Sequence, residues 1–490
     1  MSDPREPCRR IVVAGGGPIG ILAAIALRKA SPASQVVLVS QKTSPASFAD
    51  WSPTALPFAN KLHDRLGIEE SEIVLRAGGS MRLVTRYRGW SGDERAGVLP
   101  YGEVLSPELR TAFAREWGGA QGSAAGFRRR GSVAEALADK GRFAAPPPDQ
   151  PSPLADVDYA LRWSPEAYRN LLIEKARAAQ VSYVEGEIDG FEESGDGLVS
   201  AIAIEGQGRI EADFFVDCSG PQARLLASHS GFAFVDWSSY LPTRAIYLGR
   251  PLAPVIALED QTSLAEQGWR TTVNGRDGVY LAVGVAAGVD RAAALRELEA
   301  EPYAAISLAP GRAREAWLGN VVAIGDAAAR FEPIGPYACD LAHRQLDLLL
   351  EILPSRAIAP AERAEYNRRS SLMMDGVRDV LALHFASPAT ARIFGSPDRP
   401  ANVARLIDQY ERRGRIPFSE ENPHSSQELY DLAGALGFRP GLPPAARSGD
   451  AAAEATATAR HEAAIEAALA YAPRYDQWLE SISRGPSIGT

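Results

Sequence analysis

The stretch Ile11 to Gly20, IVVAGGGPIG, limits the possible folds of this chain more than any other. An apolar, β-branched run leads into Gly15, Gly17 and Gly20 in G-x-G-x-x-G spacing, and good helix formers follow. This order predicts a strand, a tight turn and a helix. The first glycine permits the turn, the second lets the backbone approach a pyrophosphate, and the third lets helix and strand pack closely. Glycine-rich turns also occur for backbone reasons alone, so the flanking strand and helix carry the prediction of a dinucleotide site.

Free N–H groups at the start of the helix would bind the phosphates. The residues expected there are Gly15, Gly16, Gly17, Pro18, Ile19 and Gly20. A second apolar strand ends at Ser40, where an acidic residue usually binds the ribose hydroxyls. Ser40, followed by Gln41, can hydrogen-bond a ribose only without charge, so we expect a weaker nucleotide site. A degenerate site that binds nothing is the alternative.

A second strand-to-helix junction lies much later in the chain. The strand VVAIGD ends at Asp326, and a helix is predicted from about Tyr337. An aspartate at the carboxyl end of a strand can accept a ribityl hydroxyl, and a nearby helix N-terminus suits the pyrimidine oxygens of a flavin. The G-D pair is common alone, but together with the glycine motif it indicates FAD. The residues expected on this side are Gly325 and Asp326, with Ile188 and Ile334 as further FAD contacts.

These features predict an α/β fold: a glutathione-reductase-like, Rossmann-type FAD-binding module, a mixed β-sheet substrate region and a helical C-terminal part. The expected module spans 8–350, with insertions at about 91–165 and 231–310, and 351–490 is expected to be helical. An Ala-rich patch near the end is predicted to be a surface helix or a partly disordered linker. Tyr101, Trp269 and Tyr280 lie in segments expected to line a substrate chamber, although plain packing is the alternative.

Composition excludes several classes of function. A net charge of −9 with interspersed charges argues against nucleic acid as the main partner. Three widely spaced cysteines suggest neither a disulfide framework nor a metal site, and no membrane span or signal peptide is expected. We therefore expect a cytoplasmic protein. No second G-x-G-x-x-G is present for NADPH, so a separate flavin reductase should supply reduced FAD; the oligomeric state stays open.

Several longer segments resemble the flavin-dependent tryptophan halogenases, from about residue 10 to about residue 420. The matching segments are IVVAGGGPIG, RLGIEESEIVLRAGGSMRLVTRYRGW, ADFFVDCSG, FVDWSSYLP, PGRAREAWLGNVVAIGDAA and AEYNRR with a later LALHF. The resemblance implies a single-component FAD module with a substrate pyramid, and FADH2 from a separate reductase. It also implies oxidation of halide to hypohalous acid, which travels along a tunnel to a lysine and a glutamate beside an aromatic, indole-like substrate.

The chain departs from this family at the residues that carry the chemistry. Arg82 stands where the family has its lysine, Gly335 stands at the glutamate position, and bulky Tyr337 falls where the halide would be contacted. A buried lysine can lose its proton, whereas a guanidinium stays protonated and is a poor nucleophile. Arg82 could still orient an oxidant or bind a carboxylate, or it is only a positively charged strand residue.

Two further signatures of the family are altered. Of the W-x-W-x-I-P motif, Trp269 remains and Thr271 replaces its partner, and the G-E-A-T stretch survives as Trp51 to Thr54. We therefore expect an atypical member that uses FADH2 and O2 on an aromatic substrate as a monooxygenase-type oxidoreductase. One alternative is a genuine tryptophan or indole halogenase with a non-lysine oxidant site. The other is a non-catalytic protein that binds FAD or another ligand on the same scaffold.

Overall fold

The computed structural model describes residues 6–92, 97–119, 131–146, 150–195, 197–442 and 450–484. Its N-terminal part builds a six-stranded sheet in the order β19-β20-β11-β1-β2-β7. The strands are β1 (Arg10–Ala14), β2 (Gln35–Ser40), β7 (Ser182–Glu185), β11 (Phe214–Asp217), β19 (Trp317–Leu318) and β20 (Val321–Ala323). All neighbouring pairs are parallel except β19 with β20, so the carboxyl ends of the five parallel strands lie on one edge.

Helices cover this sheet because its central strands are apolar along their whole length. Four of the five residues of β1 are fully buried, as in parallel strands that are covered on both faces. Helix α1 packs against α6 and α8, and α8 packs against α9. The helices of this part are α1 (Pro18–Ala30), α2 (Phe58–Leu66), α3 (Glu70–Arg76), α6 (Pro165–Ala178), α8 (Tyr337–Ile352) and α9 (Pro360–Phe385).

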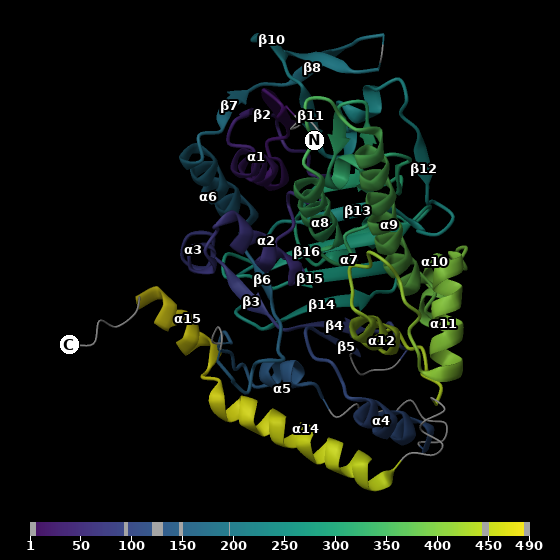
Figure 1. Cartoon of the computed structure of the whole chain (residues 1–490). Coiled ribbons are helices and arrows are strands. Elements are labelled where there is room, and N and C mark those ends of the chain that lie inside the picture. The colour runs from purple at the N-terminus through teal and green to yellow at the C-terminus, as the bar shows by residue number, and fades with distance from the viewer. Residues whose placement is uncertain are drawn as a thin grey trace, which may run out of the picture.

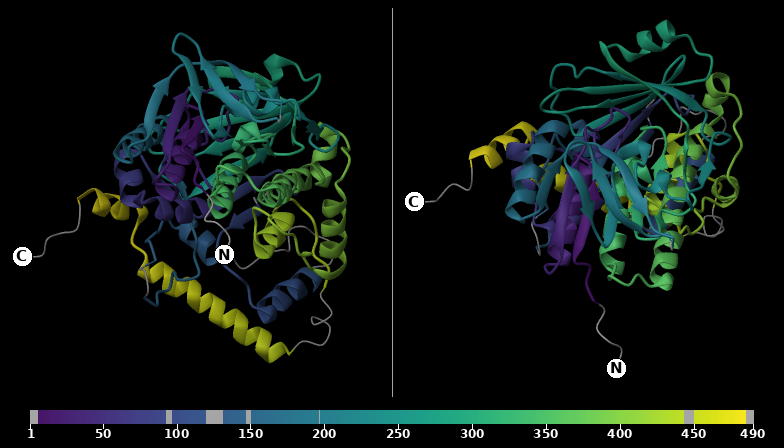
Figure 2. Two further views of the ribbon diagram at one scale, coloured as in Figure 1. Left: turned by 45° about the horizontal axis from the view of Figure 1, so that its top comes forward. Right: turned by 90° about the horizontal axis from the view of Figure 1, so that it is seen from above.

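A seven-stranded mixed sheet lies beside the first and supplies a wall of the site (Figure 1; Figure 2). Its order is β17-β13-β16-β15-β14-β4-β5, antiparallel except for β14 with β4. The strands are β4 (Val84–Arg88), β5 (Gly97–Pro100), β13 (Thr243–Gly249), β14 (Glu259–Leu264), β15 (Gly268–Val273), β16 (Tyr280–Ala286) and β17 (Pro302–Ser307). Helix α7 (Arg291–Leu298) packs against β13, β15 and β16. Five of its seven strands thus come from 243–307, and β4 and β5 come from 84–100.

Smaller elements connect the two sheets. Their strands are β3 (Ser80–Arg82), β6 (Ala160–Arg162), β8 (Ile188–Glu193), β9 (Val199–Ile204), β10 (Gly208–Glu211), β12 (Phe234–Asp236), β18 (Gly311–Ala313) and β21 (Ala329–Arg330). The short 3-10 helices are η2 (Gly220–Gln222), η3 (Leu226–Ser228), η4 (Gly325–Ala327) and η5 (Pro388–Thr390). The pair β3 and β6 is antiparallel and holds Arg82 opposite Ala160.

The regular elements described after residue 353 are all helices. They are α9, η5, α10 (Ala391–Phe394), α11 (Ala401–Arg413), α12 (Ser426–Ala435), α14 (Ala451–Tyr471) and α15 (Tyr475–Arg484). Helix α14 packs against α4 (Pro107–Gly119) and α5 (Val133–Asp139), and runs along the lower edge of the molecule in Figure 1. The Ala-rich patch is thus helical over 451–471. No helix within the described ranges combines the length and apolar character that crossing a membrane requires.

Candidate functional site

The turn after β1 has the geometry that the glycine motif predicts. Gly15 has a φ of +152° and donates its N–H to Val39 O at 2.9 Å, and a Cβ there would overlap the Cys218 carbonyl. A Cβ at Gly20 would overlap the Gly15 carbonyl in the same way. Because only glycine fits either position, strand and helix approach as closely as a dinucleotide turn requires.

The parallel register brings the other expected FAD residues to the same edge. Ser40 ends β2, while Asp326 follows β20 and is 5% exposed. Gly325 donates its N–H to Gln345 Oε1 at 2.8 Å, which fixes the start of η4. Ile188 is buried at the start of β8, close after Gly186, whose N–H bonds Ser40 O at 3.1 Å. The assignment of these side chains to FAD remains a prediction.

Asp50, which the sequence does not single out, lies against the phosphate-binding turn. Its Oδ1 accepts the Ile19 N–H at 3.0 Å, in the first turn of α1, and a Cβ at Gly17 would overlap its carboxylate. This is the position where a helix N-terminus presents its free N–H groups to an anion. Burial raises the Asp50 pKa to about 7, so the carboxyl exists in both protonation states near neutral pH.

Asp326 is engaged by the same loop. The Ala49 N–H donates to Asp326 Oδ2 at 2.8 Å, and burial raises the Asp326 pKa to about 8. The glycine turn, Ser40 and Asp326 fit FAD in type and in position along the sheet edge. Residues 49 and 50 nevertheless occupy both anchoring groups, because one bonds Asp326 and the other bonds the start of α1.

A pocket that is open at its mouth lies between this edge and the seven-stranded sheet. Loop residues near the FAD edge form one side, strands β4 and β14 to β16 form the other, and the turn before α8 closes it. The side chains that line the pocket include Phe48, Trp51, Arg82, Thr85, Tyr101, Asp260, Tyr280, Ile334 and Tyr337. Residues 51–54, the remnant of the G-E-A-T stretch, also line it.

Arg82 is fixed inside this pocket at the end of β3. It is 2% exposed, donates from Nη2 to Ala55 O at 2.6 Å and from Nη1 to Thr85 Oγ1 at 2.9 Å. Its guanidinium carbon lies 5.2 Å from the centre of the Tyr101 ring, within cation–π range. The side chain predicted to replace the family lysine therefore borders the pocket and does not point to solvent.

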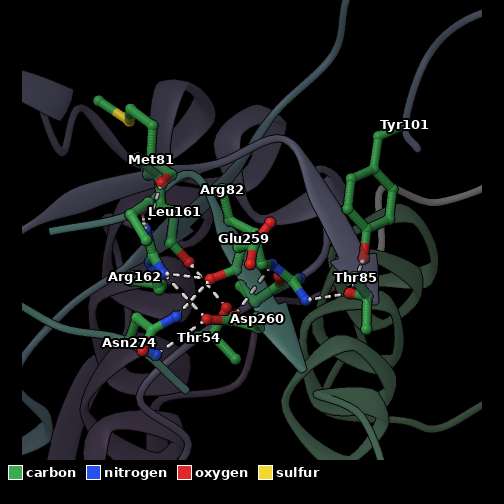
Figure 3. Close-up of polar contacts among 12 residues, drawn as sticks. Thr54, Met81, Arg82, Thr85, Tyr101, Leu161, Arg162, Glu259, Asp260 and Asn274 are labelled. Atoms are coloured by element: carbon green, nitrogen blue, oxygen red, sulfur yellow. Dashed lines mark hydrogen bonds and ion pairs between the residues drawn. The ribbon is translucent and has the colours of Figure 1, made fainter. Parts of the chain in front are cut away.

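Asp260 on β14 lies between two buried arginines (Figure 3). Arg162 Nη1 donates to Asp260 Oδ1 at 2.9 Å, whereas Arg82 Nε is 3.4 Å from Asp260 Oδ2 and makes no hydrogen bond there. Arg162 also donates to Met81 O at 2.5 Å, and the Asn274 N–H donates to Asp260 Oδ1 at 3.0 Å. The sequence does not single out Asp260, because β14 is polar on both faces, or Arg162, because it ends the three-residue strand β6.

The residues at the altered family positions occupy the turn before α8. A Cβ at Gly335 would lie 2.8 Å from the Tyr337 ring, which folds back over that glycine. Tyr337 lines the pocket and its hydroxyl is 3.0 Å from His424 Nε2. The nearby Glu332 is fully buried outside the pocket lining, 3.4 Å from Thr243 Oγ1, and burial raises its pKa to about 7. Glu332 therefore does not take the place of a pocket carboxylate.

The expectation for the chamber aromatics is met at two positions and corrected at the third. Tyr101 and Tyr280 line the pocket. Trp269 is fully buried in the core, where its ring takes the space that a Cβ at Gly284 would need and its Nε1 donates to Thr243 Oγ1 at 2.9 Å. Trp269 lies two residues before Thr271 on β15, and Thr271 lines the pocket whereas Trp269 does not. Its role is therefore packing, which was the alternative for this residue.

The sequence is similar to those of known proteins over nearly the whole chain. The tryptophan halogenase profile matches residues 10–443. Tryptophan 6-halogenase SttH of Streptomyces toxytricini is 26% identical over 501 residues, covering 92% of this chain and 94% of that protein. Tryptophan 7-halogenase RebH of Lentzea aerocolonigenes is 23% identical over 445 residues, covering 82% and 81%.

Solved structures confirm the predicted fold class. BrvH, a flavin-dependent halogenase from Brevundimonas sp. BAL3, superposes with a TM-score of 0.85 at 24% identity, covering 97% of this chain and 99% of that one. Xcc4156, a flavin-dependent halogenase from Xanthomonas campestris, gives 0.87 at 22% identity, covering 97% and 98%. The chain therefore belongs to the tryptophan halogenase family, whose cofactor is FAD, reduced by a separate flavin reductase.

Proposed function

We propose that the protein is an FADH2-dependent oxygenase of an aromatic substrate bound in the pocket. The observation that carries this proposal is that a hydrogen-bonded arginine, Arg82, stands at the position where the family has its lysine. Arg82 is held there by Ala55 and Thr85, and the family's glutamate position is Gly335 beneath the Tyr337 ring. A guanidinium keeps its proton at neutral pH, so it cannot act as a nucleophile toward hypohalous acid.

Reduced FAD would supply the two electrons for O2: one oxygen atom enters the substrate ring as a hydroxyl, the other leaves as water, and FAD is released oxidised. The glycine turn, Ser40 and Asp326 would hold the cofactor. Phe48, Trp51 and the tyrosines of the pocket would hold and desolvate the ring. Arg82 would orient the substrate through N–H groups that stay protonated.

The test supplies FAD, NADH, an unrelated flavin reductase, bromide and a panel of indoles and phenols under 18O2. The expected product carries one 18O atom and no bromine by mass spectrometry. Catalase is added throughout, so that peroxide released into solution cannot oxidise the substrate. Robust bromination, or products without label, would overturn the proposal.

A halogenase with an altered oxidant site is the second candidate. The buried position of Arg82 in the pocket favours it, because its N–H groups could hold a hypohalite. Here bromide in the same assay gives a brominated product with two waters formed per O2, and Arg82→Ala lowers bromination. If that variant brominates as well as the parent, Arg82 has no such role.

A non-catalytic protein on this scaffold is the third candidate. The Asp50 carboxyl at the start of α1 and the uncharged Ser40 favour it, since both weaken a pyrophosphate and ribose site. Titration of the purified protein with FAD and FADH2 decides the matter by flavin fluorescence and absorbance. Micromolar binding of either form removes this candidate, and millimolar or weaker binding of both supports it.

A further inference from the structure

The charges around the pocket do not balance. Among its described lining residues, the charged side chains are Arg82 and Asp260. Asp260 makes its hydrogen-bonded ion pair with Arg162, at 2.9 Å, and faces Arg82 only at 3.4 Å. Two buried arginines thus share one carboxylate, and the cluster carries one uncompensated positive charge. Burying a charge is costly unless a partner of opposite sign is present.

The neighbouring acids do not supply that partner. Glu259 is the next residue along β14, and its carboxylate is directed to Arg86 on the adjacent strand β4, which also pairs with Asp139. Glu332 is buried outside the lining and contacts Thr243. Arg276, behind β3, adds a further cation, which donates to Val74 O at 2.9 Å and Gly79 O at 3.0 Å. The surplus charge therefore resides on Arg82, the arginine that faces the pocket.

We propose that the substrate is an aromatic carboxylate, with its carboxylate bound by Arg82 and its ring directed toward the FAD edge of the pocket. This assignment of substrate class rests on the proposed function. Arg82 has five N–H groups, of which two donate to Ala55 and Thr85. Donors are left for an anion, and a guanidinium fork suits a planar carboxylate better than a point charge.

The walls of the pocket fit the rest of such a molecule. Tyr101 lies over the guanidinium, and its hydroxyl is 3.2 Å from Thr85 Oγ1, so the anionic end is bordered by polar groups. Phe48, Trp51 and Ile334 line the side nearest to the expected flavin. A carboxylate on Arg82 would leave the ring among these apolar groups. The ring would then face the cofactor directly, as oxygen transfer requires, instead of facing the residue at the lysine position.

A matched pair of ligands tests the charge alone: indole-3-acetate and the neutral indole-3-acetamide. Dissociation constants are measured by calorimetry on the intact protein without reductase or oxygen turnover. We expect the acetate to bind at least about tenfold more tightly, which is about 1.4 kcal/mol. Arg82→Gln should abolish this preference and Arg82→Lys should keep part of it. Equal affinities in the parent protein, or no detectable acetate binding, would overturn the proposal.

Arg88→Gln is the control, because Arg88 ends the next strand, β4, but is exposed and bonds Gln261 Oε1 at 2.7 Å. It removes the same charge and should leave the preference unchanged. Thermal unfolding establishes that Arg82→Gln remains folded; a folded variant that still prefers the acetate contradicts the assignment. Because no turnover is involved, acetate binding followed by bromination would refute only the oxygenase proposal.

Discussion

At the level of single residues, the Asp50 carboxyl lies at the start of α1, where the pyrophosphate of FAD is expected to bind. Its pKa is raised to about 7 by burial and lowered in part by Arg169, and the nearby Asp326 carboxyl faces the same segment. Below pH 7 the Asp50 carboxyl is neutral, and above it the carboxylate repels a pyrophosphate at the start of α1. FAD affinity should therefore fall as pH rises from 6 to 8, by about threefold to tenfold.

Asp50→Asn removes this titration and keeps an oxygen for the Ile19 N–H. The variant should bind FAD more tightly than the parent at pH 8, with a flatter pH profile; fluorescence titration at several pH values measures both. The pH dependence of FAD affinity that remains in this variant should come from Asp326. If parent and variant show the same profile, Asp50 does not compete with the pyrophosphate.

A functional residue could be predicted from the sequence where its position in the fold allows only one type of amino acid. Gly15 and Gly20 could be identified because no other residue fits the turn, and Asp326 because it follows a buried strand. Arg82 could be flagged from the resemblance, but its partners could not. Asp50 follows a loop without periodicity, and Asp260 lies on a strand that is polar on both faces, so neither has a local signal. Their contacts depend on which distant elements pack together.

At the level of elements, strand β3 depends on the C-terminal helix. The Met81 N–H donates to Tyr475 Oη at 2.6 Å, and the buried Tyr475 ring stacks on Trp478. Met81 precedes Arg82, so this bond helps to fix the strand that carries the guanidinium. Tyr475→Phe leaves a buried N–H without its partner, which should lower the free energy of unfolding by about 1–3 kcal/mol.

Urea denaturation measures that loss, and calorimetry with indole-3-acetate should show a few-fold weaker binding. Tyr471→Phe is the control, because Tyr471 ends α14 and is 47% exposed. If Tyr475→Phe is as stable as Tyr471→Phe, the C-terminal helix does not support β3.

The boundaries of these elements were only partly predictable. The run from Met81 to Trp90 alternates like one strand, but the structure divides it at Leu83, whose N–H bonds Leu258 O at 2.8 Å. The apolar pattern of helix α2 can be followed back to Pro53, but the helix begins only at Phe58. A helix begun at Pro53 would hold Pro57 in its interior, where the missing N–H and the ring break the hydrogen-bond ladder. Helix α8, in contrast, starts at Tyr337 as expected, since its apolar periodicity is strong.

At the level of the whole molecule, the sequence predicts that the first sheet is parallel but does not predict the order of its strands. The glycine motif and the strand before Asp326 predict a parallel sheet, but adjacent strands come from opposite ends of the module: β20 pairs with β11, and β11 with β1. The long insertions hide this order in the sequence. The proposed division at 350 remains a prediction, because α8 and α9 pack together across it.

The same architecture buries acids whose protonation makes stability depend on pH. Asp50 and Asp326 lie at the sheet edge and Glu332 behind the pocket, with pKa values raised by burial to about 7, about 8 and about 7. The unfolded chain releases these protons near pH 4, where aspartate and glutamate normally titrate, so between pH 4 and pH 8 the native state binds more protons. Stability from these groups is therefore complete at acid pH and is lost as pH rises through 7 and 8.

The contribution of these three acids to the unfolding free energy should thus decline with rising pH, by up to about 1.4 kcal/mol per pH unit for each group. The buried histidines His63, His343 and His384, whose pKa values burial lowers to about 3, about 4 and about 4, act in the opposite direction below about pH 6.5, so the decline should be clearest above that pH. Asp326→Asn imitates the protonated acid and keeps an acceptor for the Ala49 N–H. It should flatten the profile and stabilise the protein at pH 8, as measured by urea denaturation at pH 5 to 8. Asp398→Asn, at an exposed position, should leave the slope unchanged. An Asp326→Asn profile parallel to that of the parent would show that this carboxyl is already ionised in the folded state.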